Sequence, residues 1–69
     1  MTPDELINRF RYHPPKPGQP ERYVTIRNAA LDMANLILEL CPGSRERSLA
    51  VTALEEVVFW ANASIARNE

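Results

Sequence analysis

The chain has 69 residues, a formal net charge of -1 and a single cysteine. A domain of this size buries only about 60% of the surface that its unfolded chain exposes, so it needs disulfides, a bound metal or partner subunits. Cys41 has no second cysteine to pair with, and Cys41 and His13 together are too few ligands for a structural zinc site. We therefore expect self-association, and neither a metal nor another cofactor.

The charge is unevenly distributed along the chain. Residues 1–27 contain five Lys or Arg and three acidic residues, whereas residues 28–69 contain three and six. This predicts a locally basic N-terminal element on a mildly acidic body, and the net charge argues against linear nucleic acid as a partner. The N-terminus has no signal pattern, and we expect no apolar run of the roughly 18–20 residues that span a membrane. A soluble, intracellular protein without membrane contact is the expectation.

The predicted elements begin with a short helix within residues 1–11. Thr2 can cap it, Pro3 suits its first turn, and Glu5 stands where a capping box requires it. Residues 12–20 follow, and the segment His13–Pro20 holds four prolines. So many prolines exclude a helix and favour a stiff, extended arm.

Two long helices are predicted next, over residues 20–41 and 44–67. Pro20 suits a first helical position, Pro42 and Gly43 end the first helix, and Ser44 caps the second. A connection this short forces the two helices into an antiparallel hairpin. The predicted fold is all-α, with residues 1–69 forming one domain and no strands.

Both long helices carry more apolar surface than one neighbour can cover. At 100° per residue, the apolar arc of the first helix spans roughly 240°, and that of the second helix is similar. On the second helix, Trp60 is expected in the core, whereas Phe59 is expected to point toward the polar side. The predicted contact seams are Tyr23, Ile26, Ala30, Met33, Ile37 and Leu40 on the first helix, and Ala50, Leu54, Val57, Ala61 and Ile65 on the second. The remaining apolar stripes should contact other subunits, or else be covered by the N-terminal helix folding back.

The sequence favours a binding protein over an enzyme. Cys41 lies on an apolar stripe and is typical of a small core residue, and His13 has no carboxylate beside it. There is no glycine-rich phosphate loop or nucleophile elbow. By contrast, aromatic residues alternate with Arg and Lys over residues 9–27, and that composition suits bases and phosphates. Arg27 falls inside an apolar stripe, so it should be paired across an interface, extend to water, or face an anion.

Residues 10–27, FRYHPPKPGQPERYVTIR, and residues 41–67, CPGSRERSLAVTALEEVVFWANASIAR, resemble the phage-encoded anti-CBASS and Thoeris-antagonist hairpin family. Members of that family are sponges that sequester the cyclic oligonucleotide messengers of bacterial immune systems without cleaving them. The resemblance implies a homohexamer in the host cytoplasm, with pockets for cyclic dinucleotides between subunits and, in some members, separate pockets for cyclic trinucleotides.

The resemblance also implies the ligand-binding residues. Tyr12 matches an arm tyrosine that stacks on a base, and Arg67 matches the arginine that closes the second long helix. The start of the first long helix, where phosphate and base contacts cluster in the family, is matched by Arg22, Tyr23, Thr25 and Arg27. The implied set is Tyr12, His13, Pro14, Arg22, Tyr23, Thr25, Arg27 and Arg67. An alternative function is that of a small oligomeric interaction module that inhibits a host protein, with the arm docking as a proline-rich ligand.

Overall fold

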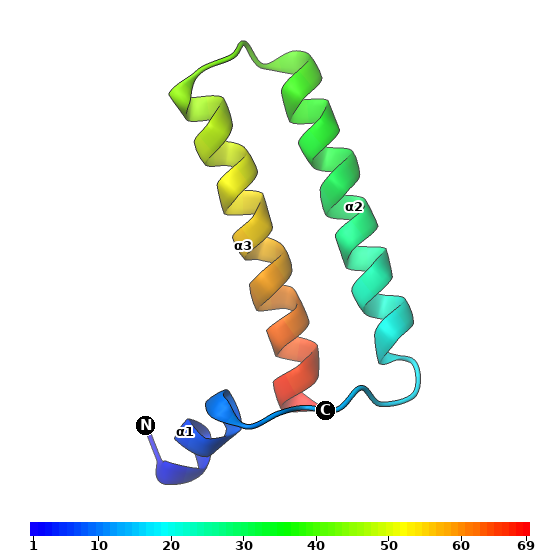
Figure 1. Ribbon diagram of the computed structural model, residues 1–69, viewed down its shortest axis with the longest axis vertical. Helices are drawn as coiled ribbons and strands as arrows, with labels where there is room; N and C mark the ends of the chain where they lie inside the picture. Colours follow the sequence, from blue (N-terminus) through cyan, green and yellow to red (C-terminus); the bar gives the residue numbers. More distant parts are fainter.

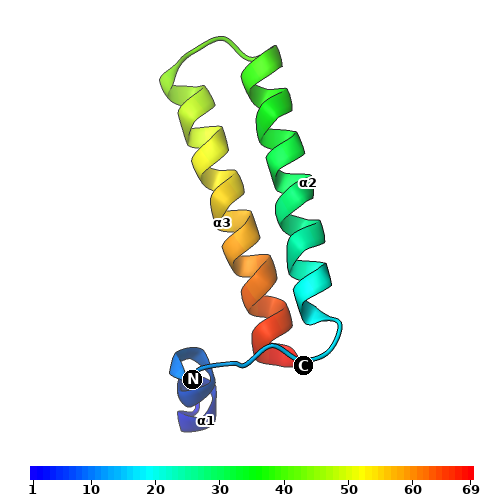
Figure 2. The same cartoon turned by 45° about the vertical axis from the view of Figure 1, so that its right-hand side comes forward.

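The computed structural model describes every residue from Met1 to Glu69 and contains three helices and no strands. The helices are α1 (Pro3–Phe10), α2 (Gln19–Leu40) and α3 (Arg45–Asn68). The prediction of an all-α chain is confirmed. In Figures 1 and 2, α2 and α3 lie side by side and the chain reverses direction in the loop between them, while α1 lies at the opposite end of the pair, beside the end of α3.

The caps explain where α1 begins and ends. The Glu5 amide donates to Thr2 Oγ1 at 3.1 Å, and the Thr2 amide donates to Glu5 Oε2 at 2.9 Å, so the predicted capping box forms. The helix ends at Phe10, where Arg11 turns to an extended conformation. After the arm, Gly18 adopts a positive φ of 85° and leads the chain into α2. A side chain at this position would be strained, whereas glycine adopts the conformation freely.

The loop between α2 and α3 is closed by Ser44 and Arg47. Ser44 Oγ accepts the Arg47 amide at 3.1 Å and so caps α3. The Arg47 guanidinium reaches back to donate to the carbonyl oxygens of Leu38 and Cys41, each at 3.3 Å. These carbonyls lie at the end of α2, where no further turn of helix can satisfy them. One arginine therefore ties the two long helices together at this end.

No hydrophobic side chain is buried in the single chain, and the only buried residue is Gln19. The molecule measures 45 × 28 × 13 Å, so it is a thin slab one layer of helices deep. Half-buried side chains between the long helices are Tyr23, Ile26, Ala30, Ala34 and Ile37 on α2 and Val51, Leu54, Val58, Ala61 and Ile65 on α3. The contact between α2 and α3 is therefore a single seam with two open sides.

The observed seam differs from the predicted one on both helices. On α3, Val51 and Val58 occupy it, whereas Ala50 and Val57 are exposed. On α2, Ala34 occupies it, whereas Met33 is 49% exposed and Leu40 is 70% exposed. The helical wheel could not separate these positions, because the apolar arc is much wider than the strip that one neighbouring helix covers. Trp60, expected in the core, is 68% exposed for the same reason.

The expectation that no segment is long and apolar enough to span a membrane does not hold for α3. The helix α3 is long and apolar enough, by length and composition alone, to cross a membrane. The only charged residues between Arg47 and Arg67 are Glu55 and Glu56, and no residue of this helix is buried. Two adjacent carboxylates at mid-helix would be costly inside a bilayer, and the core helix of a soluble protein passes the same test of length and composition. The small and apolar residues around Glu55 and Glu56 make α3 apolar on average, although the two glutamates interrupt the run.

Candidate functional site

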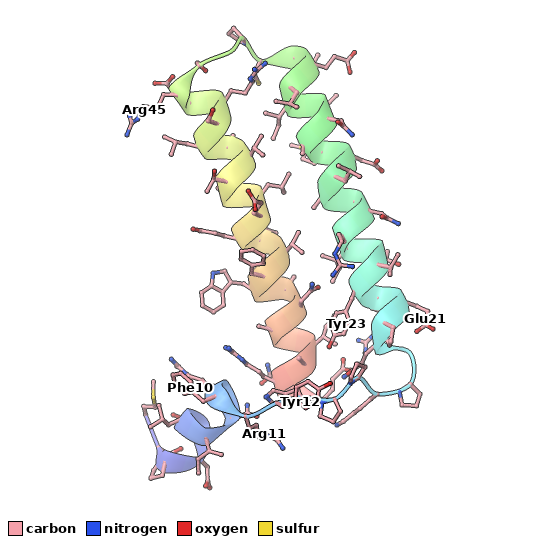
Figure 3. The ribbon with its side chains drawn as sticks, viewed as in Figure 1. Phe10, Arg11, Tyr12, Glu21, Tyr23 and Arg45 are labelled. Atoms are coloured by element: carbon pink, nitrogen blue, oxygen red, sulfur yellow. The ribbon has the colours of Figure 1, made fainter.

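The chain gathers most of its candidate site residues at the end of the slab opposite the loop. Here the C-terminal end of α1, the arm, the first turns of α2 and the last turns of α3 meet (Figures 1 and 3). Figure 3 shows Tyr12 on the arm near the end of α3, and Tyr23 pointing from α2 toward the last turns of α3. We call this region the foot of the hairpin, defined by residues 8–23 and 60–69.

At the foot, α1 is fixed to α3 by side chains that donate hydrogen bonds to the last carbonyl groups of both helices. Asn8 Nδ2 donates to the Arg67 carbonyl oxygen at 3.0 Å, and Arg67 Nη2 donates to the Arg9 carbonyl oxygen at 3.5 Å. The His13 ring lies 2.7 Å from the Asn8 carbonyl oxygen. Because a carbonyl can only accept, Nε2 is the protonated nitrogen of this ring. Two residues predicted to bind ligand thus have structural contacts: His13 ties the arm to α1, and Arg67 ties α1 to α3.

A second cluster, which we call the Glu69 cradle, consists of Lys16, Gln19 and Arg22. Arg22 donates to both carboxylate oxygens of Glu69, with Nη1 at 2.6 Å from Oε2 and Nη2 paired with Oε1. Gln19 Nε2 donates to the same Oε1 at 3.0 Å, and the Lys16 ammonium group donates to the Glu69 backbone oxygen. The hydrogen bonds from Arg22 and then Gln19 lower the pKa of Glu69 from its ordinary value of 4.5 to about 2. The hydrogen bond to Glu69 in turn raises the pKa of Arg22.

Gln19 organises this cradle. The residue is 2% exposed, its side-chain Oε1 accepts the Lys16 backbone amide at 2.9 Å, and its backbone amide donates to the Lys16 carbonyl oxygen at 3.1 Å. Gln19 therefore joins the arm to α2 and to the end of α3. Neither Gln19 nor Glu69 was predicted as a site residue. The spacing of three between Gln19 and Arg22 places both on one face of the first turn, but nothing in the sequence indicates that Glu69 comes to the same place.

Arg27 lies away from the foot, in an open groove of about 280 Å³ between α2 and α3. The groove is lined by Arg27, Ala30, Leu31, Ala34, Val51, Leu54, Glu55, Val58 and Phe59. Arg27 forms no side-chain hydrogen bond. It also forms no ion pair with Glu55 of the same groove, because the chain's one salt bridge joins Arg22 to Glu69. The predicted position in an apolar stripe is thus observed. Phe59, expected to point away from the stripes, instead forms a wall of this groove.

The remaining predicted residues differ in their solvent exposure and in the contacts that they already make within the chain. Tyr12 is 80% exposed and Pro14 is exposed, so both are open to a partner. Tyr23 is half-buried in the seam. The Thr25 hydroxyl donates to the Glu21 carbonyl oxygen of its own helix at 2.8 Å. The foot therefore contains six of the predicted residues, whereas Thr25 lies outside it and Arg27 lines the separate groove. The six are Tyr12, His13, Pro14, Arg22, Tyr23 and Arg67.

Residues 2–66 match the sequence model of the family described as "Acb2/Tad1, hairpin domain". This is the anti-CBASS and Thoeris-antagonist hairpin family, and the resemblance drawn from the motifs is confirmed. The match contains α1, the arm, α2 and nearly all of α3, whereas Arg67 and Glu69 lie just beyond it. No curated protein and no solved structure matches the chain.

Proposed function

Because the chain belongs to the Acb2/Tad1 hairpin family, whose members are anti-defence sponges, we propose that it binds and sequesters cyclic oligonucleotide messengers without cleaving them. Cyclic dinucleotides are the principal candidate ligands, and cyclic trinucleotides are further candidates. The family match carries this proposal. The site of action that it implies is the host cytoplasm, where bacterial immune systems make these messengers.

The residues at the foot supply what such a ligand requires. A cyclic dinucleotide presents two phosphodiester charges and two base faces. Tyr12 offers an exposed aromatic face, and Lys16, Arg22 and Arg67 bring cationic groups to the same end of the slab. Stacking on an aromatic side chain is worth about 1–3 kcal/mol per base, and an arginine can bind a phosphate through two parallel hydrogen bonds.

We further propose that the working form is a homo-oligomer, with six subunits as the family resemblance implies. Since the single chain buries no hydrophobic side chain, the open sides of the seam and the Trp60 surface need covering. Subunits that pack on these surfaces would also cover the groove that holds the unpaired Arg27. A ligand enclosed between subunits would leave slowly, and sequestration depends on a slow off-rate.

Binding and recovery together test this proposal. Thermal shift and calorimetry with a panel of cyclic dinucleotides, cyclic trinucleotides and cyclic ADP-ribose isomers should identify at least one tight ligand. Digestion of the complex with proteinase should then release that nucleotide intact. Degraded nucleotide would indicate an enzyme. A panel without binding, together with a host protein retained by the arm, would favour the interaction module instead.

A further inference from the structure

The Glu69 cradle has the donor arrangement of an anion-binding site. Arg22 presents two parallel N–H groups to two oxygens, Gln19 adds a third donor to one of them, and the Lys16 ammonium lies beside the pair. A phosphodiester presents two oxygens on one atom that share a single negative charge, as a carboxylate does, and a planar guanidinium suits both. The donor set is therefore not specific for a glutamate.

The cradle is built into the fold rather than formed by chance between surface side chains. Gln19 is the one buried residue of the chain, and its Oε1 is held by the Lys16 amide, which turns Nε2 toward the anion. A buried amide N–H without an acceptor destabilises the protein by the full desolvation free energy of that group. The site consequently requires an acceptor, whether that acceptor belongs to the chain or to a ligand.

Glu69 is a replaceable occupant. Its side chain is 39% exposed and that of Arg22 is 49% exposed. Exposed ion pairs typically contribute between 0 and about 1 kcal/mol, which a charged ligand with further contacts can exceed. Glu69 also lies outside residues 2–66, which match the family, so the family match itself assigns no role to this carboxylate.

We propose that Lys16, Gln19 and Arg22 form a phosphodiester-binding site that the Glu69 carboxylate occupies in the free protein. The nucleotide's phosphate displaces Glu69, which thereby acts as an internal competitor and lowers the affinity for ligand. Gln19 is a positioning residue that orients the donors. The identity of the ligand as a cyclic nucleotide depends on the proposed function, whereas the anion site itself does not.

The test compares Glu69→Gln, which removes the charge but keeps the shape, with Glu39→Gln as the matched control. Glu39 lies at the far end of α2, is exposed, and has no side-chain hydrogen bond, so its variant has the same net charge without touching the cradle. Affinities are measured for cyclic di-GMP and for dimethyl phosphate, a minimal phosphodiester. Glu69→Gln should bind both about two- to five-fold more tightly than the control, the factor that corresponds to an exposed ion pair. Arg22→Ala should lose dimethyl phosphate binding.

A measurement on the unmodified protein keeps the test independent of how the variants fold. On addition of dimethyl phosphate, the NMR signals of the Arg22 Nε–H group and the Glu69 carboxyl carbon should move together as the carboxylate is released. If these signals stay fixed, or if Glu69→Gln binds no more tightly than Glu39→Gln, the internal-competitor proposal is wrong even when cyclic di-GMP binds. Conversely, if dimethyl phosphate displaces Glu69 but no cyclic nucleotide binds any variant, the anion site is supported and the proposed function fails.

Discussion

Replacing Leu54 with alanine should reveal whether the seam between α2 and α3 is covered by other subunits. Leu54 lines the groove that holds Arg27 on one side of the seam and an apolar groove with Ile26, Met33 and Val57 on the other. In the single chain it is only half-buried. A leucine enclosed on all sides costs about 2–5 kcal/mol when truncated to alanine, because both transfer energy and packing are lost. A leucine left half open to water should cost much less.

We expect Leu54→Ala to destabilise the assembled protein by about 2–5 kcal/mol per protomer, as for other enclosed leucines. Urea unfolding followed by circular dichroism measures this loss. The titration is repeated at several protein concentrations, because assembly makes the urea midpoint depend on concentration. Leu40→Ala is the control, because Leu40 is 70% exposed at the loop end of α2. A loss below about 1 kcal/mol for Leu54→Ala, with a midpoint independent of concentration, would refute the reasoning that other subunits cover the seam.

Three further predictions concern the foot of the hairpin. Tyr12→Ala should weaken cyclic nucleotide binding by about 1–3 kcal/mol in calorimetry while the oligomer persists in size-exclusion chromatography, and unchanged affinity would place the stacking site elsewhere. Asn8→Ala removes the hydrogen bond to the Arg67 carbonyl, so amide hydrogen exchange should accelerate in α1 and not in the middle of α2. Equal exchange rates in α1 of the variant and of the unmodified protein would show that this contact does not hold α1. Because Arg22 and Gln19 depress the pKa of Glu69 to about 2, the stabilisation from this pair should be present above pH 4.5 and lost as the pH falls toward 2. A carboxyl-carbon titration should show this midpoint, and an ordinary value near 4.5 would contradict the cradle geometry.

The helices could be predicted from the sequence because local rules decide them. Thr2 and Ser44 cap their helices with the expected hydrogen bonds, and the prolines of the arm exclude a helix without reference to any distant residue. The position of Arg27 among apolar residues also followed from helical spacing alone. Features that depend on one element's own periodicity were therefore within reach.

The parts that the sequence did not reveal depend on contacts between distant segments. The pairing of Arg22 with Glu69 joins residues 47 positions apart, and Gln19 is buried only because the arm and the end of α3 close around it. The seam position of Val58 likewise depends on the rotation of α3 against α2, which an apolar arc of such width leaves undetermined. Both failures arise where tertiary geometry selects among residues that local patterns treat as equivalent.

The proline-rich arm has a consequence for how the chain behaves at high concentration. An extended segment on a protein surface normally offers unpaired amide groups that can pair with a strand of another molecule and start a fibril. Pro14, Pro15 and Pro17 have no amide hydrogen, and the Lys16 amide between them is already bonded to Gln19. The arm can therefore stay extended and exposed, with Tyr12 at its start, while offering almost no donors to a growing β-ladder.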